Sequence, residues 1–337
     1  MAELKTNYLG LELKNPIIVG ASNLVTKTDN LKQIEESGAA AVVYKSLFEE
    51  QVQLEALQLQ NELEEYNDRN AEMLSLFPDV DHAGPEEHLF NLAQARKALS
   101  IPLIASLNAT AKQTWVDYAK KLETTGVDAL ELNFYAVPRS FDDDGTKIVN
   151  EQLDVLKAVK TAVKIPVSVK LSPSYANPLN IISQMDKTGV DGFVLFNRLF
   201  QPDIDLKTET HFSPLNLSNP EDYKVALRFA GLLYGEVKGS ICANAGIYEG
   251  ADVAKLILAG ADVVQVVSTL YKNKIPHLIK MLADLSAWMD SAGYKTLDDF
   301  KGKLSRKNTK DPFVYKRAQY IDVLLKSEEI FKRYPVR

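Results

Sequence analysis

The chain has 337 residues, of which 46% are hydrophobic and 25% are charged, a composition typical of globular proteins. Its net charge of -6 argues against a dedicated nucleic-acid-binding protein, which would carry a basic stripe. The only cysteine, Cys242, excludes an internal disulfide and cysteine-rich metal sites. Residues 1–14 lack the layout of a signal peptide, and no apolar run approaches the roughly 18 residues of a membrane span. We therefore expect a soluble, cytoplasmic protein without a membrane or nucleic-acid partner.

The chain opens with a short hairpin, predicted over residues 8–16 from the turn residues Gly10 and Asn15. The apolar run at residues 16–21 predicts a fully buried strand, and residues 28–36 predict a polar helix. A weak repeat then organises the chain: a helix-ending glycine, a short turn and a buried strand. The repeat glycines are Gly38, Gly126, Gly189 and Gly260.

Further apolar runs between these repeats bring the number of predicted strands to eight. They cover residues 16–21, 41–44, 101–107, 129–132, 165–171, 192–195, 240–246 and 263–266, with amphipathic helices such as 111–125, 150–163 and 223–237 between them. Continuous apolar runs indicate strands covered on both faces, and hence a parallel sheet. Eight such units predict an α/β fold, a closed (β/α)8 TIM barrel. A doubly wound sheet is the alternative, but no strand is followed by G-x-G-x-x-G, and there is no P-loop.

Two stretches depart from this regular plan. Residues 47–99 follow the second strand and are far longer than a usual loop and helix. Residues 49–66 of this insertion are predicted to be helical, and we expect the insertion to form a lid or pocket wall. The tail after Gly293 predicts helices near residues 297–304 and 314–326. We therefore expect a barrel over residues 1–293 and a C-terminal helical extension over residues 294–337.

Residues suited to ligand binding follow the strands at their carboxyl ends, which share one mouth in a barrel. They are Ser22, Asn23, Lys45, Ser46, Ser106, Asn108, Asn133, Lys170, Ser172, Asn197, Arg198, Asn244, Gly246, Ser268 and Thr269. Lys45 and Lys170 indicate function, because lysines that end apolar strands are costly to bury without a partner. Lysines and amides without a carboxylate predict an electropositive mouth that binds a small planar anion rather than a metal.

The last two strand-to-helix turns predict a phosphate site. Gly246 allows the backbone to approach a ligand closely, and Ser268 and Thr269 open a helix whose N–H groups can bind phosphate. Ordinary helix capping is the alternative. Together with the lysines we favour phosphate, because barrels commonly bind it after strands seven and eight.

In these residues the chain resembles the dihydroorotate dehydrogenase family of FMN-dependent barrels, and also the pyrimidine-reducing domain of dihydropyrimidine dehydrogenases. The resemblance covers most of residues 1–290. It is carried by residues 10–16 (GLELKNP), Ala21, Ser22, Lys45, residues 131–133 (ELN), residues 169–171 (VKL), Asn197, residues 245–247 (AGI) and residues 264–266 (VQV). The order and spacing of these segments together are more specific than any one of them.

The resemblance implies that FMN stretches across the barrel mouth. It assigns FMN binding to Ala21, Ser22, Lys45, Asn108, Asn133, Lys170, Asn197, Gly246, Ser268 and Thr269, and substrate binding to Lys45, Asn133 and Asn197. Lys45 and Lys170 would stabilise the negative charge of reduced flavin. The resemblance further implies an oxidoreductase of pyrimidine biosynthesis that transfers a hydride between a dihydropyrimidine-like CH–CH substrate and the flavin. Proteins of this kind are commonly dimers, so we expect a homodimer.

The chain departs from the family pattern where the substrate proton is handled. The family carries a Cys or Ser base three residues beyond the Asn, and here that position is Ala136, which cannot take a proton. The next family Asn is Pro138, and residues 47–99 are unlike the extension that normally supplies substrate-binding amides. The predicted catalytic positions are therefore Lys45, Asn133 and the vacant position Ala136.

Other groups near this loop are alternatives for the missing base. Tyr135 is adjacent, but its ordinary pKa of about 10 makes it a poor base. Ser140 and the acidic residues 142–144 lie further along, where a solvated turn that ends at Gly145 is the favoured interpretation.

Two other functions stay open from the sequence. The loss of the base at Ala136 fits a barrel that binds flavin or an anionic metabolite without dihydroorotate turnover. A lyase that uses Lys170 as a Schiff-base nucleophile is the second alternative. Borohydride trapping with a carbonyl substrate would separate the lyase from a flavoprotein.

Overall fold

The computed structural model describes residues 2–50, 52, 85–134, 141, 142, 144–198, 202–212, 217–310, 312–316, 321, 325 and 327–335. Within these ranges no helix has the length and apolar character needed to cross a membrane. The predicted catalytic position Ala136, the alternative bases Tyr135 and Ser140, and most of the insertion lie outside the described residues.

Eight parallel strands close into a barrel, which confirms the predicted (β/α)8 fold. They are β3 (Ile17–Val19), β4 (Ala41–Val43), β6 (Leu103–Asn108), β7 (Ala129–Phe134), β8 (Val167–Leu171), β9 (Gly192–Leu195), β12 (Ser240–Asn244) and β13 (Val263–Val266). Each strand pairs with the next in this order, and β13 pairs with β3 to close the ring. A short strand, β5 (Leu47–Phe48), pairs with β6.

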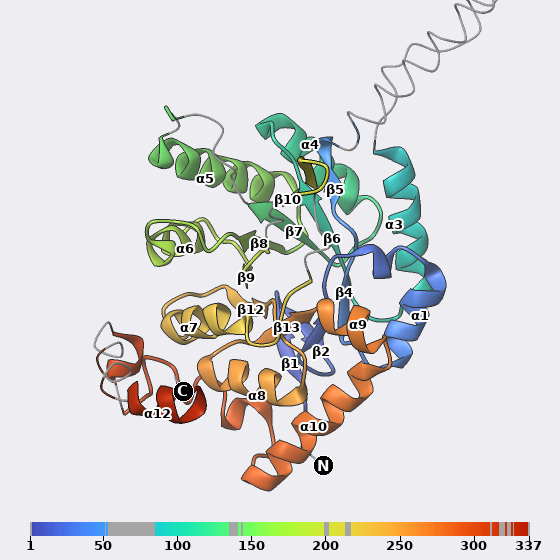
Figure 1. Ribbon diagram of the computed structural model, residues 1–337. Helices are drawn as coiled ribbons and strands as arrows, with labels where there is room; N and C mark the ends of the chain where they lie inside the picture. The colour runs from blue at the N-terminus through green and yellow to red at the C-terminus, as the bar shows by residue number, and fades with distance from the viewer. Residues whose placement is uncertain are drawn as a thin grey trace, which may run out of the picture.

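The helices surround this ring of strands (Figure 1). They are α1 (Thr28–Glu36), α3 (Glu86–Ala98), α4 (Lys112–Glu123), α5 (Gly145–Ala162), α6 (Pro178–Asp186), α7 (Tyr223–Leu233), α8 (Gly250–Ala259), α9 (Ser268–Asn273) and α10 (His277–Ala292). All four repeat glycines lie in the turns that follow helices and have φ values between +82° and +133°. Glycine is favoured at such positions because other residues are strained there, so these turns place the following strands reliably.

Side chains of the strands divide between two apolar clusters because successive residues point to opposite faces. The larger cluster lies between the strands and the helices. The smaller one fills the barrel interior at the amino ends of the strands and comprises Tyr8, Leu9, Leu13, Ile18, Ala40, Ala41, Val43, Ile104, Ala129, Val194, Cys242 and Val263. Its first three members belong to the opening hairpin, β1 (Thr6–Tyr8) and β2 (Leu11–Leu13), whose existence the sequence predicts. The hairpin packs with this end of the interior, so a ligand has to reach the barrel from the carboxyl ends.

A second hairpin follows β9 and is not predicted from the sequence. It consists of β10 (Asp203–Asp205) and β11 (Thr210–Phe212), which pair antiparallel. Nearly all of its residues are exposed, so the burial pattern that marks the other strands is missing here. Backbone pairing, a tight turn with Glu209 at a φ of +54° and short-range side-chain hydrogen bonds define this element.

The tail after α10 differs from the prediction at residues 297–304, whereas most of the second predicted helix, residues 314–326, lies outside the described residues. It contains the 3-10 helices η3 (Leu297–Asp299) and η4 (Pro312–Tyr315) and the helix α12 (Ser327–Arg333). A helix over residues 297–304 does not form, because the N–H groups of Gly302 and Leu304 donate to Ile257 and Leu258 at the end of α8. Tertiary contacts therefore replace the helical hydrogen bonds of this segment. The division of the chain at residue 293 stays a prediction.

Candidate functional site

The carboxyl ends of the barrel strands bring two buried polar clusters together above the apolar floor. The neutral cluster comprises Ser46, Ser106 and Asn133, and the charged cluster comprises Glu131, Lys170 and Gln265. Most of these residues come from adjacent strands, since β6 pairs with β7 and Asn133 on β7 lies opposite Lys170 on β8. Gln265 comes from β13, which is not adjacent to either β7 or β8.

The neutral cluster is a closed triangle of hydrogen bonds. Asn133 Nδ2 donates to Ser46 Oγ at 3.1 Å and to Ser106 Oγ at 2.9 Å, and the two hydroxyl oxygens lie 2.7 Å apart. Either hydroxyl can donate to the other, so one of the two hydroxyl protons is used inside the triangle and one is left for a ligand. Within the described residues Asn133 Oδ1 has no hydrogen-bond partner, so it is left as an acceptor.

The charged cluster lies around a carboxylate that the sequence interpretation does not expect at the mouth. Glu131 is fully buried, and its Oε2 accepts from Gln265 Nε2 at 2.5 Å. Lys170 Nζ lies 3.4 Å from Glu131 Oε1 and donates to Gln265 Oε1 at 3.1 Å. The predicted arrangement of lysines and amides without a carboxylate is therefore wrong in this respect. Lys170 is a buried cation with one anionic and one neutral partner.

The second predicted lysine differs in its surroundings. Lys45 follows β4 and is half-buried, directly before Ser46 of the neutral cluster. Within the described part of the chain its ammonium has no ion pair or hydrogen bond. Asn108, at the end of β6, is buried and lies beside Phe48 of β5. Among the described residues, Lys45 thus presents an ammonium group without a partner to a ligand.

The turn after β12 offers backbone donors. Ala245 and Gly246 have positive φ values of +72° and +69°. A Cβ at Gly246 would come within 2.6 Å of the Tyr223 nitrogen and 2.7 Å of Asp222, so glycine is required for close packing against the start of α7. The N–H groups of Gly246 and Ile247 form no hydrogen bond with any described residue. Free N–H groups at a glycine turn are suited to an anion such as phosphate.

The side chains at the turn after β13 already have hydrogen-bond partners, which the sequence does not predict. Ser268 Oγ accepts from the Ser218 N–H at 2.9 Å and from Ser218 Oγ at 2.8 Å. Thr269 is fully buried and donates to the Tyr248 carbonyl at 3.2 Å. Ser268 therefore faces residue 218, whereas Thr269 is used to hold the turn before α8.

The beginning of α8 is not open to an anion. Glu249 and Asp252 form a capping box, in which each side chain accepts from the backbone of the other. The Asp252 carboxylate also accepts from the Tyr248 N–H at 3.1 Å. Two carboxylates at this helix start would repel a phosphate, so the N–H groups of residues 246 and 247 are the better donors in this turn.

The remaining predicted site residues lie around the same mouth. Ala21 is half-buried and packs against the interior cluster, and Ser22 caps the 3-10 helix η1 (Asn23–Val25) by accepting from the Leu24 N–H. Asn197 follows β9, where its N–H donates to the Leu171 carbonyl at 2.7 Å and its side chain is half-buried. Asn244 at the end of β12 donates to the Phe196 carbonyl at 2.9 Å. The strand ends therefore converge as predicted, and several of their side chains brace the mouth.

The acidic turn after β7 is a helix start in its described part. Asp144 caps α5 by accepting from the Thr146 N–H at 2.9 Å, and Asp142 is exposed. This agrees with the solvated turn favoured from the sequence and gives no support to Asp144 as the base.

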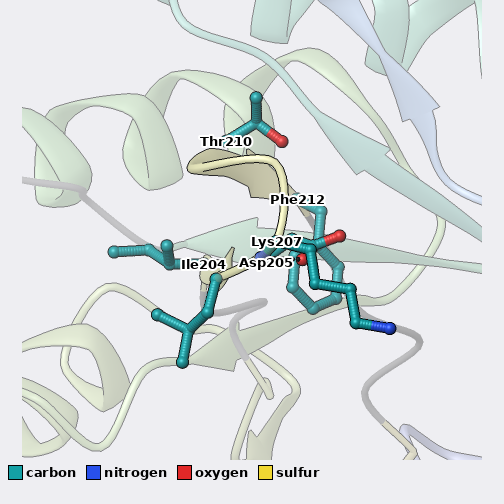
Figure 2. Close-up of a pocket in the computed structure, with 6 residues that line it drawn as sticks. Ile204, Asp205, Lys207, Thr210 and Phe212 are labelled. Atoms are coloured by element: carbon teal, nitrogen blue, oxygen red, sulfur yellow. Dashed lines mark hydrogen bonds between the residues drawn. The ribbon is translucent and has the colours of Figure 1, made fainter.

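A hollow of about 440 Å³ lies on the β10–β11 hairpin, in the connection between β9 and α7. Figure 2 shows its lining residues, which include Ile204, Lys207, Thr210 and Phe212. All belong to the exposed hairpin, and none is a strand end of the barrel. We therefore place the candidate site at the barrel mouth and not in this hollow.

Sequence reasoning missed three residues of the site: Glu131, Gln265 and Ser218. Glu131 and Gln265 stand inside apolar strand runs, where a charged or amide side chain is costly unless it has a partner. That cost is a signal present in the sequence. Ser218 lies in a loop without such a signal, and only the folded chain places it against Ser268.

The fold and the site define a (β/α)8 barrel with a cationic, hydrogen-bonding mouth, a class that binds anionic metabolites and cofactors at the carboxyl ends of its strands. Residues 3–289 match the family model described as dihydroorotate dehydrogenase. The chain belongs to the dihydroorotate dehydrogenase family. Members of this family are flavin-dependent oxidoreductases, and the protein is an oxidoreductase that acts on CH–CH groups.

Curated relatives support this assignment along most of the chain. The dihydroorotate dehydrogenase B (NAD(+)) catalytic subunit of Methanocaldococcus jannaschii is 30% identical over 314 residues, which cover 89% of this chain and 97% of the relative. The protein of the same name from Thermoplasma volcanium is 28% identical over 316 residues, or 90% of this chain and 98% of the relative. The dihydroorotate dehydrogenase A (fumarate) of Lactobacillus helveticus is 28% identical over 212 residues, or 60% of this chain and 68% of the relative. These names differ in the electron acceptor.

Proposed function

We propose that the protein is an FMN-dependent oxidoreductase of pyrimidine biosynthesis that transfers a hydride between a dihydropyrimidine-like CH–CH substrate and FMN. The observation that carries this proposal is the buried Lys170 at the end of β8, held by Glu131 and Gln265 beside Asn133. Glu131 offsets the burial of Lys170, and Lys45 has no ion pair within the described residues, so these side chains keep a positive charge that suits a negatively charged ligand. Membership of a flavin-dependent family makes FMN the ligand that fits best.

The residues at the mouth fit the parts of FMN. Free N–H groups of Gly246 and Ile247, with Ser268 nearby, suit its phosphate. Lys45 and Lys170 suit the polar edge of the ring, where charge gathers on reduction. The full proposed set is Ala21, Ser22, Lys45, Asn108, Asn133, Lys170, Asn197, Gly246, Ser268 and Thr269, of which Thr269 would act by shaping the turn.

FMN when bound supplies the acceptor or donor of the hydride, and the chain supplies position, charge and hydrogen bonds. Lys45, with its unpaired ammonium, would hold an anionic group of the substrate. Asn133 Oδ1 would accept from a substrate N–H, because both of its amide protons go to serines. Asn197 is the third proposed substrate contact. These groups would orient the reacting carbons before the hydride moves.

None of the residues assigned above is placed as the base that takes the substrate proton. Ser46 and Ser106 are held by Asn133 and by each other, and within the described residues neither contacts a basic group that would take its proton. The family base position is Ala136, outside the described residues. This favours the second candidate function, a flavin- or anion-binding barrel of the same family without dihydroorotate turnover.

The lyase alternative has less support. A Schiff-base lysine reacts as a neutral amine. Lys170 instead contacts two acceptor oxygens, of Glu131 and Gln265, as a cation does. We therefore assign Lys170 to charge stabilisation.

The first test is reconstitution with FMN, followed by anaerobic mixing with dihydroorotate, dihydrouracil and related dihydropyrimidines. We expect a yellow protein with one FMN per chain that loses its absorbance near 450 nm with one of these substrates. A protein that takes up no FMN would refute the proposal. FMN uptake with no reduction by any dihydropyrimidine would favour the second candidate function.

Substitution Ala136→Cys tests the missing base. Because the family uses a Cys or Ser here, we expect the variant to reduce its flavin with dihydroorotate faster than the native protein, by about 10²-fold or more. Ala136→Val is the matched control, since it adds bulk without a titratable group. No gain in the Cys variant would place the obstacle in the unusual insertion at residues 47–99.

We extend the proposal to the assembly and location of the protein, as a homodimer in the cytoplasm. The support is family membership alone. Sedimentation of the FMN-loaded protein at micromolar concentration would show a monomer if the dimer is wrong.

A further inference from the structure

Glu131 is the buried anion beneath the mouth, and its role is not explained by packing alone. It projects from β7, one inward-facing position before Asn133, and its side chain is fully buried. Both of its oxygens are used, one by Gln265 Nε2 at 2.5 Å and the other by Lys170 Nζ at 3.4 Å. Gln265 also accepts from Lys170, so the three side chains form a closed ring across the barrel interior.

Gln265 connects Glu131 and Lys170 in this ring, and the barrel interior has space for its side chain. It lies on β13 beside β3, the first strand of the barrel. At Gly20, just after β3, a Cβ would lie 3.4 Å from Gln265 Oε1 and 2.9 Å from a methyl group of Val267. The absence of a side chain at Gly20 therefore leaves Gln265 in reach of both Glu131 and Lys170.

No other charged group balances Glu131 within the described residues. The two titratable groups that it influences on the floor side are Tyr8 and Cys242. Burial raises the pKa of Tyr8 well above its ordinary value, and the nearby Cys242 and Glu131 add to this. Burial followed by Glu131 also raises the pKa of the Cys242 thiol, against a smaller lowering by Lys170. Both groups are therefore uncharged near neutral pH, and Lys170 is the counter-charge of Glu131.

The charges of the two lysines and Glu131 can then be compared. Lys45 and Lys170 each contribute +1 and Glu131 contributes -1, so these three side chains together carry a net charge of +1. A charge in a poorly solvated interior interacts strongly with its neighbours. Glu131 therefore offsets part of the positive charge that the two lysines present to a ligand.

We propose that Glu131 is a positioning residue that holds Lys170 through Gln265 and lowers the reduction potential of the flavin by offsetting the positive charge of the mouth. This inference rests on the proposed function, because it requires FMN at the mouth. Reduction adds negative charge to the flavin, so a nearby carboxylate disfavours the reduced form relative to the oxidised form. Lys170 acts in the opposite direction, and the ring of three side chains fixes the balance between them.

The test is the midpoint potential of bound FMN in Glu131→Gln, measured by slow photoreduction against reference dyes. Glutamine has the shape of glutamate without its charge, so Lys170 then acts on the flavin unopposed. We expect the reduced flavin to gain at least tenfold in affinity relative to the oxidised flavin, which is a rise of about 30 mV for a two-electron couple. The control is Glu151→Gln, which removes a carboxylate from the exposed surface of α5 and should change the ratio by less than twofold.

An unchanged or lower potential in an FMN-loaded Glu131→Gln protein would overturn the inference and leave the proposed function standing. Failure of the native protein to bind FMN would overturn both the inference and the proposed function. The native protein is tested for FMN binding before any variant is made, so the two failures can be distinguished. If Glu131→Gln does not fold, Glu131→Asp takes its place, since it keeps the counter-charge of Lys170 but withdraws it by one methylene. A twofold to tenfold change in the same direction would then support the inference, and no change would refute it.

Discussion

The two polar clusters of the barrel mouth lie on neighbouring strands, yet they are stabilised differently. In the neutral cluster, Asn133 and the serines satisfy one another through hydrogen bonds, and one hydroxyl proton is left over. In the charged cluster, Glu131 and Lys170 offset each other's burial through an ion pair that Gln265 completes. A buried hydrogen bond can be lost at modest cost, whereas a buried charge without its partner costs several kcal/mol. The charged cluster should therefore be the more sensitive part of the site.

Substitution Lys170→Met gives the largest expected effect. It leaves Glu131 as a buried, unpaired carboxylate, and the unfolding free energy should fall by about 3–5 kcal/mol. Urea unfolding of the cofactor-free protein, followed by circular dichroism, measures the loss. The double variant Lys170→Met with Glu131→Gln should recover most of the lost stability, because it contains no unpaired charge. A double variant as unstable as the single one would show that packing, not charge, dominates the cluster.

Substitution Ser106→Ala tests the neutral cluster. It removes one acceptor of Asn133 and the hydroxyl partner of Ser46, and we expect a loss of about 1–3 kcal/mol in unfolding free energy. Ser168→Ala is the matched control, because Ser168 is equally buried in the barrel but makes one hydrogen bond, to the Leu130 carbonyl. A cost as large for Ser168 as for Ser106 would argue against a cooperative triangle.

Glu49 lies outside both clusters, and its contribution to the unfolding free energy should depend on pH. Burial by itself raises the pKa of this carboxyl, but hydrogen bonds from Thr110, Ala111 and Thr114 outweigh it, so the pKa is lowered from the ordinary value of 4.5. A group whose folded pKa is lowered stabilises the protein above its unfolded pKa. That contribution is lost as the pH falls from about 4.5 through the folded pKa.

Substitution Glu49→Gln measures this contribution. We expect a loss of about 1–2 kcal/mol near pH 7, the usual size for a helix-start acceptor. The difference between variant and native protein should shrink as the pH falls below 4.5. Unfolding free energies of both proteins, measured between pH 3 and pH 7, test this expectation. If the two proteins differ by the same amount at every pH, the carboxylate charge is not involved.

The smallest effect is expected on the surface. Lys147 and Glu151 form an exposed pair on α5 at 3.9 Å. Glu151→Gln should change the unfolding free energy by less than about 0.5 kcal/mol, because solvent screens exposed charges. A larger loss would mean that burial does not explain why the Glu131–Lys170 pair contributes more to stability than the exposed Lys147–Glu151 pair.

The barrel follows from the sequence alone, because local signals specify it. Apolar runs without alternation indicate strands covered on both faces, and glycines at the repeat positions adopt the positive φ that the turns require. Once the strands are placed in order, their carboxyl ends have to meet at one mouth, so Lys45, Asn133 and Lys170 could be grouped without coordinates. The order and spacing of these segments also indicated the family, which the family model confirms.

Which partners these residues have depends on contacts that form only in the folded chain. Glu131 and Gln265 are 134 residues apart in the chain, and nothing local predicts that they meet. The β10–β11 hairpin was missed because its residues are exposed, and the tail failed to form its predicted helix because its N–H groups donate to α8. The pattern of residues in a sequence reflects burial and local backbone preference. Hydrogen bonds and charge balance between distant strands depend on how the chain closes, and so they appear only in the folded protein.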